Sequence, residues 1–160
     1  MQQTLDDLLA GDDPAELGRA EAALAGCDGR DSDLDAALTA LIWRRRAQGP
    51  RGIVETLIRP DCVERLDRIA TDLERVGARD AATAFRRLRR ACPLADAQLG
   101  PGVIDWLDTE FDFARTARRI ETDLDDIAPD VWAFLRRRRS ACAGVPLPPE
   151  RRGLLARLFG

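Results

Sequence analysis

The spacing of apolar residues constrains this chain more than any other feature of its sequence. Apolar residues recur every three and four positions, and β-branched residues rarely alternate with polar ones. The first spacing places side chains on one face of a helix, whereas a half-buried strand needs strict alternation. A chain of 160 residues buries roughly 70% of its unfolded surface around one core. We therefore predict an all-α fold in a single compact multi-helix domain.

Glycine and proline residues divide this pattern into helices. We predict a helix over residues 61–76 with Gly77 as its C-cap, and a second helix over residues 79–92. Two helices joined at one glycine form an antiparallel hairpin, which we place at the centre of the domain. The break at residues 100–102 precedes a further helix with one apolar stripe. The stripe contains Ile104, Leu107, Phe111 and Ala114.

The helical domain is expected over residues 1–142 and a different segment over residues 143–160. That segment begins with an extended, proline-rich linker over residues 143–149 and ends in a short amphipathic stub that docks on the body. The first residues lack the basic start and apolar core of a secretory signal, and no apolar run is long enough to span a bilayer. We expect a cytoplasmic protein that does not contact a membrane.

The residue types that are missing exclude several kinds of chemistry. All 25 basic residues are arginines, and lysine, histidine, tyrosine and asparagine are absent. Imidazole bases, lysine Schiff bases and phenols are therefore excluded, and Ser32 and Ser140 lack a base to activate them. Glu121, Asp123 and Asp125 alternate as in a calcium loop, but the glycine and glutamate of that loop are missing. We predict no catalytic residue, no cofactor and no metal.

The four cysteines follow neither zinc-ligand nor disulfide-scaffold spacing. Intervals of 35, 30 and 50 residues separate them. The ordinary interpretation is a set of scattered buried thiols, since free cysteine behaves as a small core residue. A redox pair is the alternative. The residues are Cys27, Cys62, Cys92 and Cys142.

The net charge of −3 conceals blocks of opposite sign. Residues 1–40 carry −8, residues 41–103 carry +5, residues 104–130 carry −6 and residues 131–160 carry +6. A simple nucleic-acid binder needs a basic excess on one face, so we predict no direct contact with nucleic acid. The blocks indicate electrostatic self-complementarity or a bipolar surface.

Three arginine runs lie in the final turns of predicted helices. A cation there stabilises the negative end of the helix dipole by about 0.3 to 1 kcal/mol, so a structural role needs no ligand. The alternative is a surface for an anion or an acidic partner. The runs are Arg44–Arg46, Arg86–Arg90 and Arg136–Arg139.

Aspartates follow a pattern that suggests a partner-binding surface. Two sets share the spacing i, i+3 and i+7, and on continuous helices each set would form a carboxylate row with neighbours about 5 to 6 Å apart. Such rows resemble the spacing of DNA phosphates, although a solvated helix face is the simpler interpretation. The sets are Asp105, Asp108, Asp112 and Asp123, Asp126, Asp130.

Each of the three tryptophans lies beside the apolar stripe of its predicted helix. The ordinary interpretation places Trp43, Trp106 and Trp132 at the margin of the core. The alternative is an anchor that faces a partner or a second copy, because tryptophan is enriched at binding hot spots. We include Trp106 with the two acidic sets as candidate partner-binding residues.

Short motifs over roughly residues 34–139 resemble a bacterial family of DNA-mimic proteins, also described as domain of unknown function 4375. They are the loop Gly49 to Ile53, the segment LERVGARDAA at residues 73–82, the segment IDWLDTEF at residues 104–111, and a weaker match at residues 123–135. The resemblance implies an all-helical protein whose acidic surface occupies the DNA site of a regulator, and it leaves a monomer or a dimer open. This chain departs from that type in its loop sequence and in its 25 arginines.

These observations lead to one functional hypothesis and one alternative. We predict a non-enzymatic interaction domain whose acidic helix faces bind a basic protein partner, such as a DNA-binding regulator. The sequence does not decide between a monomer and a homodimer. The alternative is an enzyme or a small-ligand-binding protein that uses carboxylate and arginine pairs.

Overall fold

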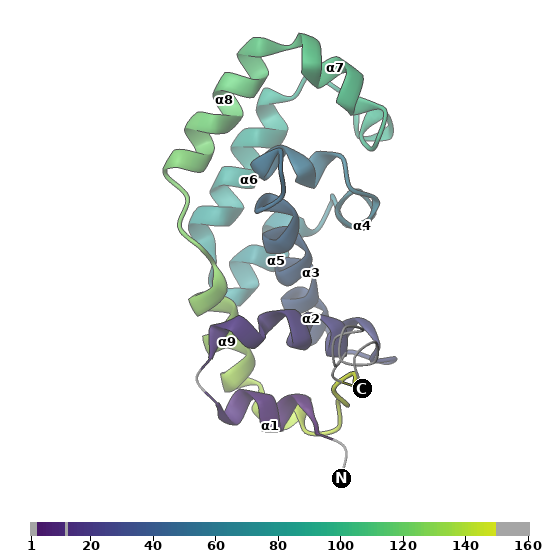
Figure 1. Cartoon of the computed structure of the whole chain (residues 1–160), viewed down its shortest axis with the longest axis vertical. Helices are drawn as coiled ribbons and strands as arrows, with labels where there is room; N and C mark the ends of the chain where they lie inside the picture. The colour runs from purple at the N-terminus through teal and green to yellow at the C-terminus, as the bar shows by residue number, and fades with distance from the viewer. Residues whose placement is uncertain (1–2, 12, 150–160) are drawn as a thin grey trace, which may run out of the picture.

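Helix α3 (Ser32–Ala47) forms the centre of the molecule. Its eight residues from Ala36 to Trp43 are all buried, so neighbouring elements cover it on every side. Asp31 caps the helix, and its side chain accepts hydrogen bonds from the backbone N–H groups of Asp33 and Leu34. The computed structural model describes residues 3–11 and 13–149 of the chain (Figure 1).

The other elements surround α3 in an elongated helical domain (Figure 1). Within the described residues there is no named strand, which confirms the predicted all-α fold. The elements that pack directly against α3 are α2 (Leu17–Ala25), the 3₁₀ segment η2 (Gly52–Leu57), α4 (Pro60–Val63), α5 (Ile69–Val76) and α9 (Ala128–Arg137).

The predicted helical hairpin is present as α5 and α6 (Arg79–Ala91) around Gly77. Gly77 adopts a left-handed conformation with φ of 99° and ends α5. The predicted helix over residues 61–76 is divided, because residues 64–68 form turns between α4 and α5. Arg68 at this break lies 2.5 Å from Asp35 of α3, so a tertiary ion pair holds the turn against α3.

One end of the molecule consists of the 3₁₀ segment η3 (Asp96–Gln98), α7 (Val103–Thr109) and α8 (Phe111–Thr122). Helix α8 packs along α6 on one side and against η2 on the other. Helix α7 crosses the top of this arrangement in Figure 1. This end carries the candidate site.

The opposite end contains α1 (Leu5–Ala10), the 3₁₀ segment η1 (Pro14–Glu16), α10 (Arg139–Cys142) and the proline-rich segment over residues 143–149. The last segment is extended, as expected, but it packs onto the body. Leu5 donates its backbone N–H to Val145, and Leu147 donates to Gln3. Val145 and Leu147 are buried. The stub expected over residues 153–160 lies outside the described residues.

Two further structural results concern the membrane and the thiols. Over residues 3–11 and 13–149, every helix is too short or too polar to cross a bilayer. The four cysteines are free thiols, and all except the partly exposed Cys27 are buried. Burial raises the pKa of Cys62 to about 12 and that of Cys142 to about 11.

Candidate functional site

The loop before η2 lies against α8, and a carboxylate of α8 holds it in place. Gly52 has a φ of 60°, which favours glycine. A β-carbon on Gly52 would lie 1.7 Å from Oε1 of Glu121, so a side chain at this position would occupy the space of that carboxylate. The neighbouring residue, Ile53, donates its backbone N–H to the same Oε1. The loop and α8 are therefore joined at one point of close backbone approach.

The carboxylate of Glu55 also packs against this loop. Glu55 is 1% exposed, and its Oε2 lies 2.5 Å from Nε of Arg59. Its Oε1 has no hydrogen-bond partner among the described residues, and Nη1 of Arg51 is 3.9 Å away. Gly49 passes close above Glu55, because a β-carbon there would lie 3.0 Å from Glu55 Cγ. Both glycines of the loop thus make room for a glutamate.

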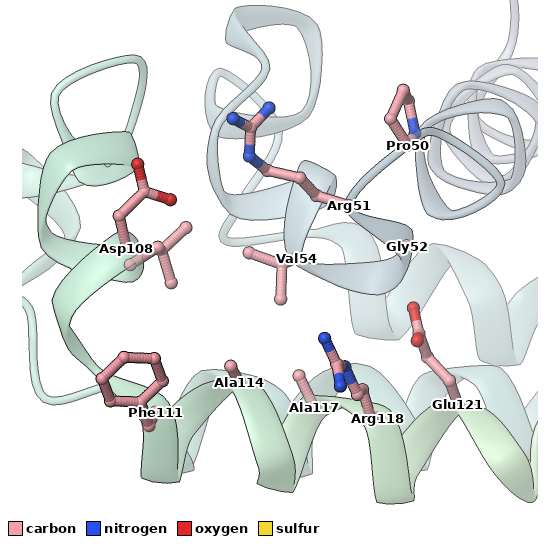
Figure 2. Close-up of a pocket in the computed structure, with 11 residues that line it drawn as sticks. Pro50, Arg51, Gly52, Val54, Asp108, Phe111, Ala114, Ala117, Arg118 and Glu121 are labelled. Atoms are coloured by element: carbon pink, nitrogen blue, oxygen red, sulfur yellow. The ribbon is translucent and has the colours of Figure 1, made fainter.

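A groove of about 410 Å³ lies between this loop and α8 (Figure 2). We call it the α8 groove. Its volume falls in the range of about 300 to 1,000 Å³ that is typical of binding pockets. The apolar part of its lining consists of Pro50, Val54, Leu107, Phe111, Ala114 and Ala117, and the charged part consists of Arg51, Asp108, Arg118 and Glu121.

An acidic surface borders the α8 groove at the junction of α7 and α8. Four exposed carboxylates lie on α7, between the two helices and in the first turn of α8. Phe111, the first residue of α8, is 76% exposed and is the one large apolar side chain in the described chain that lies exposed. Three of these carboxylates form no ion pair with any described residue. The fourth, on Asp112, lies 3.4 Å from Arg115, and both side chains are largely exposed, so the pair is weak. We call Asp105, Asp108, Glu110, Asp112 and Phe111 the acidic corner.

The first predicted aspartate row is not continuous. Asp105 and Asp108 lie on α7, whereas Asp112 lies in the first turn of α8, because the helix is interrupted at Glu110. The interruption brings the rings of Trp106 and Phe113 to a centroid distance of 5.4 Å, although two turns of a straight helix would separate them by about 10 Å. Burial of Phe113 therefore overrides the helical pattern of the sequence.

The same break changes the predicted apolar stripe of residues 104–114. We expected Phe111 to face the core with Ile104 and Leu107. The structure places Phe111 at the surface and leaves Ile104 and Leu107 only partly buried. Phe113, which the stripe omitted, is the buried aromatic residue of α8.

The second predicted row is also divided. Asp123 is the C-cap of α8, Asp126 lies in the connecting segment, and Asp130 is in the first turn of α9. Nε and Nη2 of Arg44 lie 2.6 and 2.7 Å from the two carboxylate oxygens of Asp126, and Asp126 also accepts the backbone N–H of Ala128. The hydrogen bonds from Arg44 lower the pKa of Asp126. Asp126 thus joins α3 to the start of α9.

Arginines of the predicted runs form ion pairs between elements. Arg45 lies 2.8 Å from Glu21 and 3.0 Å from Asp61, and Arg46 lies 2.8 Å from Asp61. In the other two runs, similar pairs join Arg86 to Glu74, Arg89 to Asp96, Arg138 to Asp33 and Arg139 to Asp6. The ion pairs of these arginine runs therefore connect elements, and none of them involves a residue of the acidic corner.

The tryptophans differ in exposure. Trp43 and Trp132 are 2% and 4% exposed and belong to the core, so neither presents a surface anchor. Trp106 is partly buried against Phe113 at the acidic corner. Within the described residues, no group of three or more acidic or cysteine side chains is arranged to hold a metal ion.

Four residues of the site were not among those that the sequence suggested: Arg51, Phe111, Arg118 and Glu121. Gly49 to Gly52 was recognisable as a loop, but nothing in the sequence indicates that Glu121, far along the chain, is its partner.

Comparisons with protein-family models, curated proteins and solved structures found no match. The functional argument therefore depends on the geometry of this site.

Proposed function

We propose that this protein is a non-enzymatic interaction domain that binds a basic segment of a partner protein at the acidic corner. One observation carries the proposal. Most carboxylates near the arginine runs are paired across helices, whereas Asp105, Asp108 and Glu110 are exposed without a cationic partner in the described chain and stand next to exposed Phe111. A basic segment would neutralise these charges and cover the aromatic ring.

The α8 groove beside the acidic corner supports this proposal. Hot spots of protein interfaces combine an apolar anchor in a pocket with charges around it. The groove offers an apolar lining of Val54, Leu107 and Ala114, and Asp108 stands at its edge (Figure 2). A partner side chain of moderate size can enter there while neighbouring cations contact the aspartates.

We further propose a DNA-binding regulator as the partner, since its phosphate-binding surface carries the cations that the acidic corner would attract. The resemblance to DNA-mimic proteins is consistent with this partner. Asp123 and Asp130 are secondary candidates for contact, while Asp126 is already paired with Arg44. A cytoplasmic location agrees with such a partner and stays a prediction.

The test compares two triple variants with equal net charge. Asp105→Asn, Asp108→Asn and Asp112→Asn neutralise three of the four carboxylates of the acidic corner. The control neutralises Asp28, Glu64 and Asp67, which are exposed elsewhere. The ligands are purified DNA-binding domains and labelled arginine-rich peptides, and the measurement is fluorescence anisotropy over a range of salt concentrations. We expect the corner variant to bind about tenfold or more weakly and the control to bind like the wild type.

Salt and DNA provide two further measurements. Binding of the wild type should weaken steeply as salt increases, because exposed charges are screened. Double-stranded DNA should compete with the protein for a DNA-binding partner. Equal binding by the two triple variants, or binding that salt does not change, would contradict the proposal.

A further inference from the structure

The chain contains a segment whose chemistry complements the acidic corner and the α8 groove. Residues 150–160 carry three arginines and one acid, and four large apolar residues. The apolar residues are spaced i, i+1, i+4 and i+5, which places them on one face of a helix. They are Leu154, Leu155, Leu158 and Phe159.

An apolar face of this kind needs an apolar surface next to negative charge. The α8 groove provides Val54, Leu107 and Ala114 as its apolar lining, with the exposed ring of Phe111 at one end. Its volume of about 410 Å³ exceeds the 250, 320 and 350 Å³ of three other cavities of the domain. The charged lining of the groove is balanced, with Arg51 and Arg118 against Asp108 and Glu121. The excess negative charge beside the groove comes from the other carboxylates of the acidic corner, and it complements the arginines of the segment.

The fold places this segment far from the groove of its own copy. Pro146 pairs with Thr4 beside α1, at one end of the molecule, whereas α7 lies at the other end (Figure 1). Phe111 is the first residue of α8, directly after α7. As a helix, residues 150–160 would be about 17 Å long. To reach Phe111 of its own copy, the segment would have to extend past α9 and α8, which are about 15 and 18 Å long. A helical segment attached at Pro149 cannot cover that path.

We propose that residues 150–160 of one copy occupy the α8 groove of a second copy. The contact is head-to-tail, so each pair leaves one groove and one segment unoccupied, and further copies can add to either end. This assembly uses the surface of the proposed function but does not depend on that function. A partner that enters the groove would also release the segment of the neighbouring copy.

Two full-length variants and their mixture test this contact. The groove variant carries Phe111→Arg and Ala114→Arg, which fill the groove and add positive charge at residues that are not fully buried. The segment variant carries Leu155→Asp and Leu158→Asp. The matched control carries Ala91→Arg and Ala133→Arg, at exposed positions of α6 and α9. The measurement is sedimentation velocity over a range of protein and salt concentrations, with circular dichroism to verify folding.

We expect the wild type and the control to form complexes larger than a dimer at high protein concentration and low salt. Each of the other variants alone should associate about tenfold or more weakly. Their equimolar mixture should form a complex that stops at two copies, because one chain contributes the groove and the other the segment. A monomeric wild type, or a mixture that forms no dimer, would overturn the proposal.

The segment variant also separates this proposal from the proposed function. It keeps the acidic corner and leaves the groove free, so it should bind arginine-rich peptides at least as tightly as the wild type does. Loss of peptide binding in all proteins together with intact self-association would contradict only the proposed function. Peptide binding without self-association would contradict only the head-to-tail contact.

Discussion

Gly52 is the residue at which the loop and α8 come closest, and its replacement tests how that contact contributes to stability. Alanine at this position would have to adopt a φ of 60° and would displace the Glu121 carboxylate that accepts the N–H of Ile53. The left-handed conformation and the lost hydrogen bond together should lower the free energy of unfolding by about 2 to 5 kcal/mol. Urea denaturation of Gly52→Ala measures this change.

Gly29 provides the control for this prediction. It also has a left-handed φ, of 76°, but a β-carbon there would meet no atom within 4 Å. Gly29→Ala should therefore cost only the conformational term of about 1 to 2 kcal/mol. Equal losses in the two variants would show that the contact with Glu121 contributes nothing.

The ion pair of Asp126 with Arg44 should make the stability of the protein depend on pH in the acidic range. Arg44 lowers its pKa in the folded state, so the ion pair stabilises the protein above the unfolded value of about 4, and this contribution is lost as the pH falls through the lowered folded pKa. Asp126→Asn should lower stability at neutral pH by about 0.5 to 1 kcal/mol, since the pair is partly exposed. In urea titrations the difference between the two proteins should begin to shrink near pH 4 and disappear below the lowered folded pKa of Asp126.

Asp126→Ala separates the charge of this side chain from its hydrogen bond. Asparagine keeps an oxygen that accepts the N–H of Ala128, whereas alanine does not. The alanine variant should lose about 1 kcal/mol more than the asparagine variant. An equal loss at all pH values would indicate that the ion pair with Arg44 is not the cause.

Single residues also show where sequence reasoning stops. Gly77 was predicted as the C-cap of a helix, and its φ of 99° confirms this, because the signal is local. The pairing of Glu121 with Gly52, and of Asp126 with Arg44, depends on helix packing between distant parts of the chain. No spacing rule in the sequence identifies such partners.

At the scale of elements, the junction of α7 and α8 decides which aromatic side chain belongs to the core. Phe113 is 6% exposed and contacts Trp106, whereas Phe111 is 76% exposed. Phe113→Ala should lower stability by about 3 to 5 kcal/mol through the cavity it creates, and Phe111→Ala should change it by less than about 0.5 kcal/mol. Thermal and urea unfolding of this pair of variants provide the measurement.

A greater loss of stability in Phe111→Ala than in Phe113→Ala would instead support the continuous helix that the sequence predicts. If residues 103–122 formed one helix, Phe111 would continue the stripe of Ile104 and Leu107, and its loss would be the more costly. Local periodicity fails here because a hydrophobic contact across two turns is worth more than the interrupted backbone hydrogen bonds. Neither acidic set meets the condition for a carboxylate row, because neither lies on one continuous helix.

The proline-rich segment makes an element-scale prediction of its own. Leu147 is 4% exposed, and its N–H bonds to Gln3, so residues 143–149 complete the packing of α1. Leu147→Ala should lower the free energy of unfolding by about 2 to 5 kcal/mol, whereas Pro149→Ala at an exposed position should be nearly neutral. A neutral Leu147→Ala would show that the segment is only a linker.

For the whole molecule, composition and periodicity were sufficient to predict the all-α class and the hairpin of α5 and α6, although the centre of the molecule is α3. The turns of residues 64–68 and the break at Glu110 were not predicted, because tertiary contacts such as Arg68 with Asp35 determine them. The charge blocks indicated a self-complementary molecule. Ion pairs such as Arg138 with Asp33 and Arg139 with Asp6 agree with that interpretation, since they join the basic C-terminal part to the acidic N-terminal part.

The absence of histidine, lysine and tyrosine gives the whole chain a simple dependence of stability on pH. Histidine is the side chain that ordinarily titrates between about pH 5 and pH 8, and the chain has none, so stability should be nearly constant over that range. At higher pH the buried thiols matter. Burial raises the pKa of Cys62 to about 12 and of Cys142 to about 11, whereas an unfolded thiol has a value of about 8.5.

The buried thiols should make the protein less stable as the pH rises, because the folded state keeps their protons to higher pH than the unfolded state does. Above about pH 8.5 the unfolded chain loses thiol protons that the folded protein keeps, so unfolding becomes more favourable as the pH rises. Each thiol should lower stability by about 1.4 kcal/mol per pH unit until its folded pKa is reached. Urea denaturation at several pH values measures this slope. In a variant with Cys62→Ala and Cys142→Ala the slope should largely disappear, and an unchanged slope would assign the alkaline loss of stability to other groups.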